Sequence, residues 1–245
     1  MAISVDTVYK TVLLILNKEQ RGYITPDEFN KIGSQVQREI FEAYFEDLNQ
    51  QLRVPQTDMD YANRVAITDE KIAEFKTQAD ATHTTNGIFT LPADLYRLGS
   101  VTYTANNTNP VEIQRITRGE YYNINMSPLT TPSESFPIYL YEDNKILVYP
   151  TSINTKVKVD YLKKPDDVTW AYQIDPTTQA FIFAGTNTGA GVFPSTGAVD
   201  FQLHNSERTE VILKILLYQG IVIRDPQVVQ AAAQKVQQEE VNEKS

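Results

Sequence analysis

The sequence predicts an α+β protein in which helices from both ends of the chain form one helical body and a central antiparallel β-sandwich or barrel-like unit projects from it. Two observations lead to this fold class. Apolar residues recur at steps of three and four up to about residue 80 and again after residue 206, whereas the apolar period between these stretches is two. We therefore expect an N-terminal helical part at 1–85, a β unit at 86–203 and C-terminal helices at 204–245.

The first predicted helix follows the N-cap candidate Ser4 and carries one apolar stripe. The stripe consists of Val5, Val8, Tyr9, Val12, Leu13 and Leu16. A second helix begins at Thr25, where Pro26 takes the first helical position and Glu28 completes a capping-box sequence. Its apolar face runs for about seven turns through Phe29, Ile32, Val36, Ile40, Tyr44, Leu48 and Leu52.

This long helix needs a partner for its apolar face, and the residues that follow it supply one. Apolar positions there are spaced 4, 3, 4, 3 and 4 residues apart, at Tyr61, Val65, Thr68, Ile72, Phe75 and Ala79. A turn at Val54 and Pro55 would join the two helices into a long antiparallel hairpin.

The middle of the chain consists of short β-branched or aromatic runs separated by turn sequences. The runs lie at 88–91, 98–104, 111–116, 138–141, 146–149 and 157–162, with further strands expected at 168–174, 180–184 and 199–203. Residues 138–149 form the clearest hairpin, and residues 185–197, rich in glycine and threonine, are expected to be an exposed loop.

Helical spacing returns near the C-terminus. Ser206 is the predicted N-cap of a helix that continues to Ile221. Asp225 and Pro226 repeat the cap-then-proline signal and would begin a last helix through Val236. The final residues are polar and are expected to fray.

Charge and composition exclude several function classes. The chain has 22 basic and 31 acidic residues, a net charge of −9, and no basic cluster, so it does not resemble a basic nucleic-acid binder. It has no cysteine, which excludes disulfides, thiolate zinc sites and cysteine nucleophiles. The apolar run near the N-terminus, residues 12–16, is too short for a signal-peptide core or a membrane span, so we expect the protein to be made and kept in a cytosol.

Residues 17–28 overlay the twelve-residue calcium loop of an EF-hand, with Asn17, Glu19 and Glu28 at ligand positions. Two features oppose calcium binding. The first position is asparagine rather than aspartate, and Arg21 would point a fixed positive charge at the ion. The capping box explains Glu28 without a metal, so we predict that no metal binds here.

No set of residues forms a recognisable catalytic site. His83 and His204 lie in different segments, and His204 is expected to bond locally to backbone beside a helix start. Residues 185–191 lack the lysine and following helix of a phosphate loop. The acidic pairs at 142–143 and 166–167 fall in turns, where water keeps carboxylates ordinary. We therefore predict neither an enzyme nor a bound cofactor or small-molecule ligand.

Aromatic residues leave one binding hypothesis open. Trp170, Tyr161 and Tyr172, with the tyrosines at 139, 141 and 149, could form a platform for sugar rings. Aromatic side chains at alternating strand positions are more often cross-strand core pairs, and we favour that interpretation.

Three stretches resemble structural proteins of short-tailed phages, in particular the head-to-tail adaptor or ring proteins of crAss-like phages and related podoviruses. They are LLILNKEQRGYITPDEFNKIGSQVQREIFEAYF (13–45), ILVYPTSINTKVKVDYLKKPDDVTW (146–170) and DFQLHNSERTEVILKILLYQGIVIRDPQVVQ (200–230). The resemblance implies a virion protein at the head–tail junction that forms a ring of about twelve copies beneath the portal. It also implies the portal and other tail or ring proteins as partners, and genomic DNA that passes through without specific binding.

The residues themselves are compatible with that role. A ring needs two different complementary patches on each copy, which a helical hairpin and open strand edges can provide. An acidic lining would let DNA slide. We assign the contact surface to five glutamines near the C-terminus, Gln227, Gln230, Gln234, Gln237 and Gln238. We expect residues after Gln234 and the 185–197 loop to become ordered against neighbouring copies. The alternatives are a glycan- or receptor-binding sandwich of a phage tail and a calcium-responsive binding protein, and no membrane contact is expected.

Overall fold

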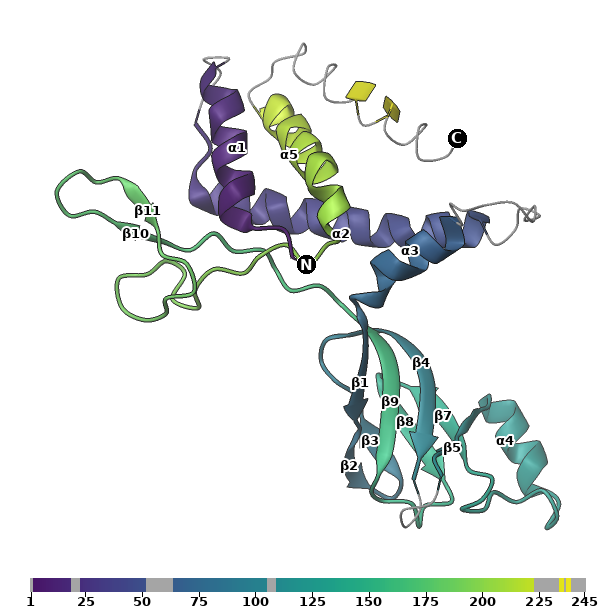
Figure 1. Cartoon of the computed structure of the whole chain (residues 1–245). Helices are drawn as coiled ribbons and strands as arrows, with labels where there is room; N and C mark the ends of the chain where they lie inside the picture. The colour runs from purple at the N-terminus through teal and green to yellow at the C-terminus, as the bar shows by residue number, and fades with distance from the viewer. Residues whose placement is uncertain are drawn as a thin grey trace. The chain divides into compact units, whose positions relative to one another are not determined.

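The computed structural model describes residues 2–18, 23–51, 64–104 and 109–222, together with residues 234, 235, 237 and 238. Contacts divide the chain into two compact units (Figure 1). The helical unit comprises Met1–Glu74 and Pro165–Ser245, and the β unit comprises Phe75–Lys164. These boundaries differ from those expected at 85/86 and 203/204, because residues 76–80 pair with a strand of the β unit and residues 165–203 pack on a helix of the helical unit.

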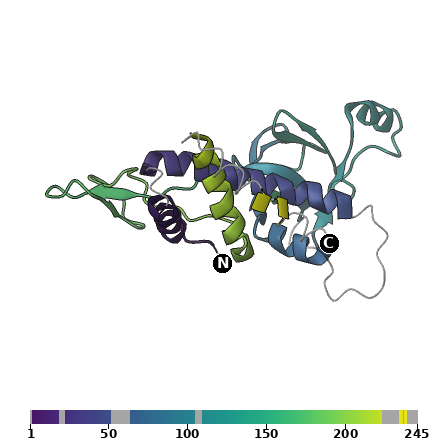
Figure 2. The same cartoon turned by 90° about the horizontal axis from the view of Figure 1, so that it is seen from above.

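Four α-helices and a short 3₁₀-helix are described in the helical unit. They are α1 (Val5–Lys18), α2 (Pro26–Gln51), α3 (Arg64–Ala73), η1 (Asn205–Glu207) and α5 (Arg208–Val222). The expected helices after Ser4, Thr25 and Ser206 are thereby confirmed, and with the strands of the β unit so is the α+β fold class. Helix α5 packs against both α1 and α2, as Figure 2 shows from above. No helix among the described residues is long and apolar enough to cross a lipid bilayer.

The predicted capping box of α2 is present. The Glu28 carboxylate accepts hydrogen bonds from the Thr25 backbone N–H at 2.9 Å and from its hydroxyl at 2.8 Å, and the Glu28 N–H donates to Thr25 Oγ1 at 3.4 Å. These hydrogen bonds from Thr25 hold the pKa of Glu28 below its usual value. The carboxylate is therefore occupied in starting the helix.

The predicted partner of α2 is shorter than expected. Helix α3 packs against α2 but ends at Ala73, and residues 76–80 form strand β1 instead of continuing the helix to Ala79. The apolar spacing was misleading here because β1 makes a five-residue antiparallel ladder with strand β9 (Val157–Lys163), and such tertiary pairing overrides a weak local helical pattern. Leu52, Tyr61 and the turn at Val54 lie outside the described residues, so the long antiparallel hairpin stays a prediction.

The described residues of the β unit form nine strands in two sheets. In chain order they are β1 (Lys76–Asp80), β2 (Thr82–Thr85), β3 (Ile88–Thr90), β4 (Leu95–Tyr103), β5 (Val111–Glu112), β6 (Gln114–Arg115), β7 (Ile138–Glu142), β8 (Lys145–Tyr149) and β9 (Val157–Lys163). One sheet has the order β1-β9-β4-β5 and the other β2-β3-β8-β7-β6. All neighbouring pairs are antiparallel except β6 and β7, which run parallel.

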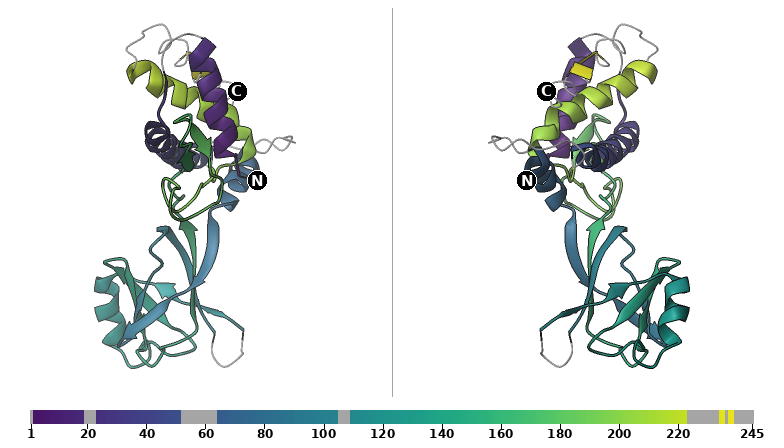
Figure 3. Two further views of the ribbon diagram at one scale, coloured as in Figure 1. Left: turned by 90° about the vertical axis from the view of Figure 1, so that its left-hand side faces the viewer. Right: turned by 90° about the vertical axis from the view of Figure 1, so that its right-hand side faces the viewer.

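A single apolar core joins the two sheets of the β unit. Phe89 and Val148 from one sheet and Val101 and Val159 from the other belong to the same buried cluster, as in a sandwich. Helix α4 (Arg118–Asn125) was not predicted; it covers the opposite face of β7 and β8, and Figure 3 shows it beside these strands. Its start carries a complete capping box, formed by Thr117 and Glu120.

Turn chemistry fixes two hairpins of the β unit. The predicted hairpin at 138–149 is confirmed, and both turn residues, Asp143 and Asn144, have positive φ. The hairpin of β2 and β3 was missed, although its turn is Asn86-Gly87, a strong hairpin signal. Gly87 has φ +75°, and a Cβ atom there would lie 2.5 Å from the Val148 carbonyl oxygen, so only glycine fits without strain.

Residues 165–203 return to the helical unit and contain fewer strands than expected. Only β10 (Tyr172–Ile174) and β11 (Phe181–Phe183) form a ladder. The run at 199–203 does not form a strand. It makes two isolated bridges, Thr169 with Val199 and Ile3 with Phe201.

A short 3₁₀-helix, η1, precedes α5, which begins at Arg208. His204, not Ser206, caps η1, and its Nδ1 accepts a hydrogen bond from the Ser206 N–H at 3.3 Å. The local backbone bond expected of His204 is therefore confirmed. Asp225 and Pro226 lie outside the described residues.

Candidate interaction surface

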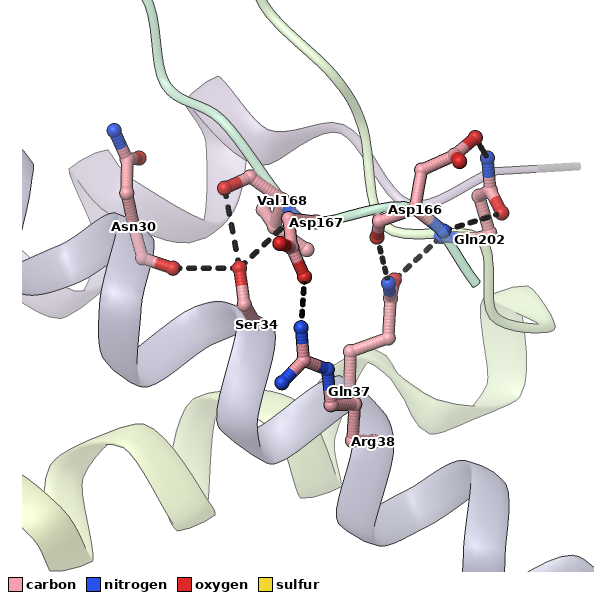
Figure 4. Close-up of polar contacts among 8 residues, drawn as sticks. All are labelled: Asn30, Ser34, Gln37, Arg38, Asp166, Asp167, Val168 and Gln202. Carbon is pink, nitrogen blue, oxygen red and sulfur yellow. Dashed lines mark hydrogen bonds and ion pairs between the residues drawn. The ribbon is translucent and has the colours of Figure 1, made fainter. Parts of the chain in front are cut away.

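Helix α2 holds the extended segment 166–170 with a row of polar side chains (Figure 4). Asn30 accepts a hydrogen bond from the Trp170 N–H at 2.6 Å and donates to its carbonyl at 3.5 Å. The Ser34 hydroxyl accepts from the Val168 N–H at 3.0 Å and also lies 3.3 Å from its carbonyl. The Gln37 amide donates to the Asp166 carbonyl at 2.7 Å. We call these three side chains the α2 ladder.

The spacing of the α2 ladder explains how side chains of a helix can bind the backbone of segment 166–170 as a neighbouring strand would. Two residues of extended chain advance about 6.6 Å, and four residues of helix advance about 6 Å. Asn30 and Ser34 are four residues apart on α2 and bind Trp170 and Val168, which are two apart on the segment. The backbone groups of the segment are thereby satisfied without a β partner on that side.

Two further contacts fix the C-terminal end of the ladder. Gln37, which is buried, accepts a hydrogen bond from the Gln202 N–H at 2.7 Å, so one amide ties together two segments of the unit. Arg38 forms an ion pair with Asp167. The ladder was missed in the sequence because the apolar stripe of α2 dominated the pattern; the available signal was a second, polar row at steps of four and three.

An aromatic stack continues from the core of the helical unit toward its surface. The Phe29 and Tyr9 ring centroids are 4.9 Å apart, and Tyr9 lies 4.3 Å from Trp170. Trp170 in turn stacks on Phe183 at 5.6 Å and on Tyr172 at 6.1 Å. Burial raises the pKa of the Tyr9 hydroxyl, as expected for a group inside this stack.

The stack supports a hairpin whose outer part is apolar and exposed. We call residues 172–183, which comprise β10, β11 and their turn, the arm. In Figures 1 and 2 the arm projects from the end of the helical unit at which α2 begins. Ile174, Phe181 and Ile182 are exposed on it, and β10 is the only strand neighbour of β11 among the described residues. Exposed apolar side chains and an open strand edge are features of protein interaction sites.

A groove lies at the base of the arm within the same unit. It has a volume of about 550 Å³. Its lining joins an apolar part, which includes Tyr172, Phe193 and Pro194, to charged residues of α2, which include Lys31 and Arg38. Phe193 is 51% exposed, so the apolar part is open to a partner.

The β unit carries a separate apolar surface. Tyr122 on α4 and Met126, Leu129 and Phe136 in the segment after it are exposed, Leu129 to 96%. Large apolar side chains this close together in sequence are unusual on a surface that faces only water. We call these four residues the α4 surface.

Charge is divided unevenly between the units. The helical unit has 13 basic and 23 acidic side chains, a net charge of −10, whereas the β unit has 9 and 8, a net charge of +1. Long-range repulsion of phosphate is therefore a property of the helical unit alone.

Four partly or fully buried charges link α3 to the start of α5. Lys71 Nζ lies 2.6 Å from Glu207 Oε1, and Lys214 Nζ lies 2.8 Å from Glu210 Oε1. Burial raises the pKa of Glu207, but its ion pair with Lys71 and its hydrogen bonds outweigh burial and lower the pKa. Burial raises the pKa of Glu210 to about 7 despite the opposing Lys214, and the neighbouring Glu207 adds to the rise.

Two of the three residues considered for metal binding lie among the described residues. Glu28 is engaged in the capping box, Asn17 is the last residue but one of α1, and Glu19 lies outside the described residues. No group of three or more potential metal ligands occurs among the residues that the structure describes.

The other candidate residues have structural partners. Trp170 is only 3% exposed, and its Nε1–H donates to Asp6 Oδ1 at 3.1 Å, so the core interpretation of this residue is confirmed. Tyr161 belongs to β9 and donates to Asp94 at 3.0 Å. The acidic residues Glu142 and Asp167 form ion pairs with arginines.

The remaining candidates behave as follows. His83 is on β2, with its ring 5.2 Å from that of Phe89. The 185–197 loop closes on itself through hydrogen bonds such as that from the Gly189 N–H to the Ser195 carbonyl, 3.1 Å. Gln234, Gln237 and Gln238 are helical and exposed, whereas Gln227 and Gln230 lie outside the described residues.

Replacing Gln37 by leucine is expected to lower the free energy of unfolding by about 2 kcal/mol. Leucine keeps most of the volume but leaves the Asp166 carbonyl and the Gln202 N–H without their partner, and an unsatisfied buried polar group costs about 1–3 kcal/mol. Urea denaturation followed by circular dichroism measures the loss. Gln35→Leu on the exposed side of α2 is the matched control and should change stability by less than about 0.5 kcal/mol. Equal losses in the two variants would contradict the role of the ladder.

Comparison with known proteins assigns the chain to a family. A sequence comparison with curated proteins gave no match. The family model described as SU10 adaptor protein matches residues 28–182, which is more than half of the chain. The match begins at the capping residue Glu28, includes the α2 ladder and the whole β unit, and ends within the arm. The chain therefore belongs to the SU10 adaptor protein family and is a phage structural protein of the head–tail adaptor type.

Proposed function

We propose that this chain is the subunit of a ring, of about twelve copies, that sits beneath the portal, joins the capsid to the tail and continues the DNA channel. Membership of an adaptor family is the observation that carries the proposal. The narrower resemblance to crAss-like phages, seen in the sequence, suggests the same location in the virion.

The distribution of apolar surface supports a connector. A subunit of a ring between two other assemblies must contact lateral neighbours and at least one axial neighbour. The helical unit presents the arm and its groove, and the β unit presents the α4 surface. We propose that one set serves contacts between copies and that the α4 surface serves a tail or portal protein.

The charge distribution supports a conduit that does not retain DNA. With a net charge of −10, the helical unit repels phosphate, so DNA near it would pass without strong binding. The exposed glutamines Gln234, Gln237 and Gln238, together with Gln227 and Gln230, remain our proposed additional contact surface; they are uncharged and can exchange hydrogen bonds with a neighbour.

Electron microscopy tests the proposal. The purified chain is imaged alone and mixed with the portal protein of the same phage, and its mass is measured in parallel. We expect rings of uniform copy number, either free or attached to the portal. A particle that stays monomeric in both settings and does not bind the portal would contradict the proposed function.

A further inference from the structure

We propose that the arm of one copy seats its tip in the groove at the base of the arm of the next copy, so that copies are linked tip to base. The tip consists of Ile174, Asp175, Phe181 and Ile182. This inference rests on the proposed ring and names the surfaces that would close it.

Contact with a partner would stabilise the arm. A two-stranded hairpin alone is at best marginally stable in water. The base of the arm is covered by Trp170, through its stacking on Tyr172 and Phe183. Toward the tip the stack continues only through Phe181, whose ring lies 4.9 Å from that of Tyr172, and Ile174, Phe181 and Ile182 remain exposed. Burying their apolar surface would stabilise the hairpin.

The groove is suited to receive such a tip. Its volume of about 550 Å³ accommodates several side chains, and its apolar part is formed by Tyr172, Phe193 and Pro194. Lys31 and Arg38 also line it, and Lys31 is exposed. The charges in the lining, two aspartates and these two cations, sum to zero on a unit whose net charge is −10. The groove is thus a place where an acidic segment meets no net repulsion.

The charge of the arm matches that environment. Residues 165–203 contain four aspartates and no lysine or arginine. The only charged residue of the arm is Asp175, whose carboxylate lies in the turn and accepts from the Thr177 N–H at 2.9 Å and the Thr178 hydroxyl at 2.7 Å. The two cations of the groove are paired with its two aspartates, Lys31 with Asp27 and Arg38 with Asp167, so Asp175 would enter a lining without net charge and meet no net repulsion there.

We infer that the occupant of the groove is the tip of a second copy rather than the tip of the same chain. Tyr172, at the start of β10, is itself part of the groove wall, whereas the tip lies at the far end of the same strands. The tip therefore cannot turn back into the groove of its own chain. A contact between the tip of one copy and the base of the next is heterologous, so it propagates from copy to copy and closes into a ring if the rotation allows.

Cross-linking in a chain without cysteine tests the contact directly. Ile182→Cys at the tip and Lys31→Cys in the groove are combined in one chain, assembled with the portal and treated with a short bis-maleimide. We expect a ladder of covalent oligomers up to the ring size. The matched control replaces Lys31→Cys by Glu42→Cys, which is exposed on α2 about 16 Å further along the helix and does not line the groove, and should lower ladder formation at least tenfold. Separate chains carrying one cysteine each should give dimers only.

A second measurement separates this inference from the proposed function. Ile182→Asp is expected to keep the wild-type melting temperature, because the side chain is exposed, but to lose ring assembly. If wild-type rings form while Ile182→Asp assembles equally well, or if the groove and control pairs cross-link equally, the tip-to-base contact is wrong and the proposed function stands. If the wild-type chain neither assembles nor binds the portal, the proposed function itself fails.

Discussion

Replacing Trp170 by alanine is expected to lower the free energy of unfolding of the helical unit by about 3–5 kcal/mol. The indole contacts the rings of Tyr9, Tyr172 and Phe183, so alanine would leave a cavity among these three rings. The change also removes the indole N–H that Asp6 Oδ1 accepts at 3.1 Å. Urea unfolding followed by far-ultraviolet circular dichroism measures the loss, because the variant has no tryptophan left for fluorescence.

Two further variants separate the contribution of the Trp170 ring to stability from that of its indole N–H group. Trp170→Phe keeps an aromatic ring and loses the hydrogen bond, so its loss should be smaller than that of alanine. Phe136→Ala removes a ring of similar size that is exposed on the β unit, and should cost less than about 0.5 kcal/mol. A loss of less than about 1 kcal/mol for Trp170→Ala would show that the stack does not hold the arm in place.

Trp170→Ala should also reduce assembly, and by more than its loss of folding stability alone would explain. Trp170 contacts the base of the arm, so its loss frees the hairpin even where the rest of the unit stays folded. Assembly with the portal, measured at a temperature at which Trp170→Ala is still folded, should therefore be reduced. This links the core of the helical unit to the proposed contact surface.

Local signals in the sequence predicted local structure well. Thr25, Pro26 and Glu28 begin α2 as expected, and the turn at Asp143 and Asn144 forms the expected hairpin, because each depends on bonds among a few neighbouring residues. Two missed elements carried equally clear signals. Thr117 and Glu120 make a capping box before α4, and Asn86 and Gly87 make a hairpin turn.

The errors arose where distant residues decide the structure. The spacing of Ile72, Phe75 and Ala79 suits a helix, yet residues 76–80 form a strand because β9, about 80 positions later, offers them a complete ladder. The interaction surface was missed for a related reason. Asn30 and Ser34 have meaning only when the segment at 166–170 lies beside α2, and no local pattern reveals that pairing.

Replacing Lys71 by methionine is expected to lower the free energy of unfolding by about 3–5 kcal/mol. Methionine keeps the aliphatic stem but removes the cation that lies 2.6 Å from Glu207, a carboxylate that is only 3% exposed. Removing one partner of a buried ion pair leaves an uncompensated charge, which costs more than the pair contributes. Lys31→Met, which removes a lysine from an exposed pair with Asp27, is the matched control and should cost less than about 1 kcal/mol.

The pH dependence of the stability lost in Lys71→Met shows whether the loss is electrostatic. In the wild-type protein Lys71 lowers the pKa of Glu207 against the effect of burial. Without Lys71, burial is opposed only by the hydrogen bonds with Glu210 and Ser206, and we expect it to raise this pKa above its value in the unfolded chain. A carboxyl group whose pKa is raised on folding binds more protons in the folded state, so stability falls as pH rises through that range. The loss in Lys71→Met, measured against the wild type at each pH, should therefore be largest at about pH 8 and smaller at about pH 5, where Glu207 can take up a proton instead of remaining charged and unpaired. Glu210, with a pKa of about 7, shares a hydrogen bond with Glu207, so the pH dependence of the difference belongs to the Glu207–Glu210 pair rather than to Glu207 alone. A loss that is the same at both pH values would mean that Lys71 acts through packing, for example on the Tyr44 ring 5.7 Å from its ammonium group, rather than through the charge of Glu207.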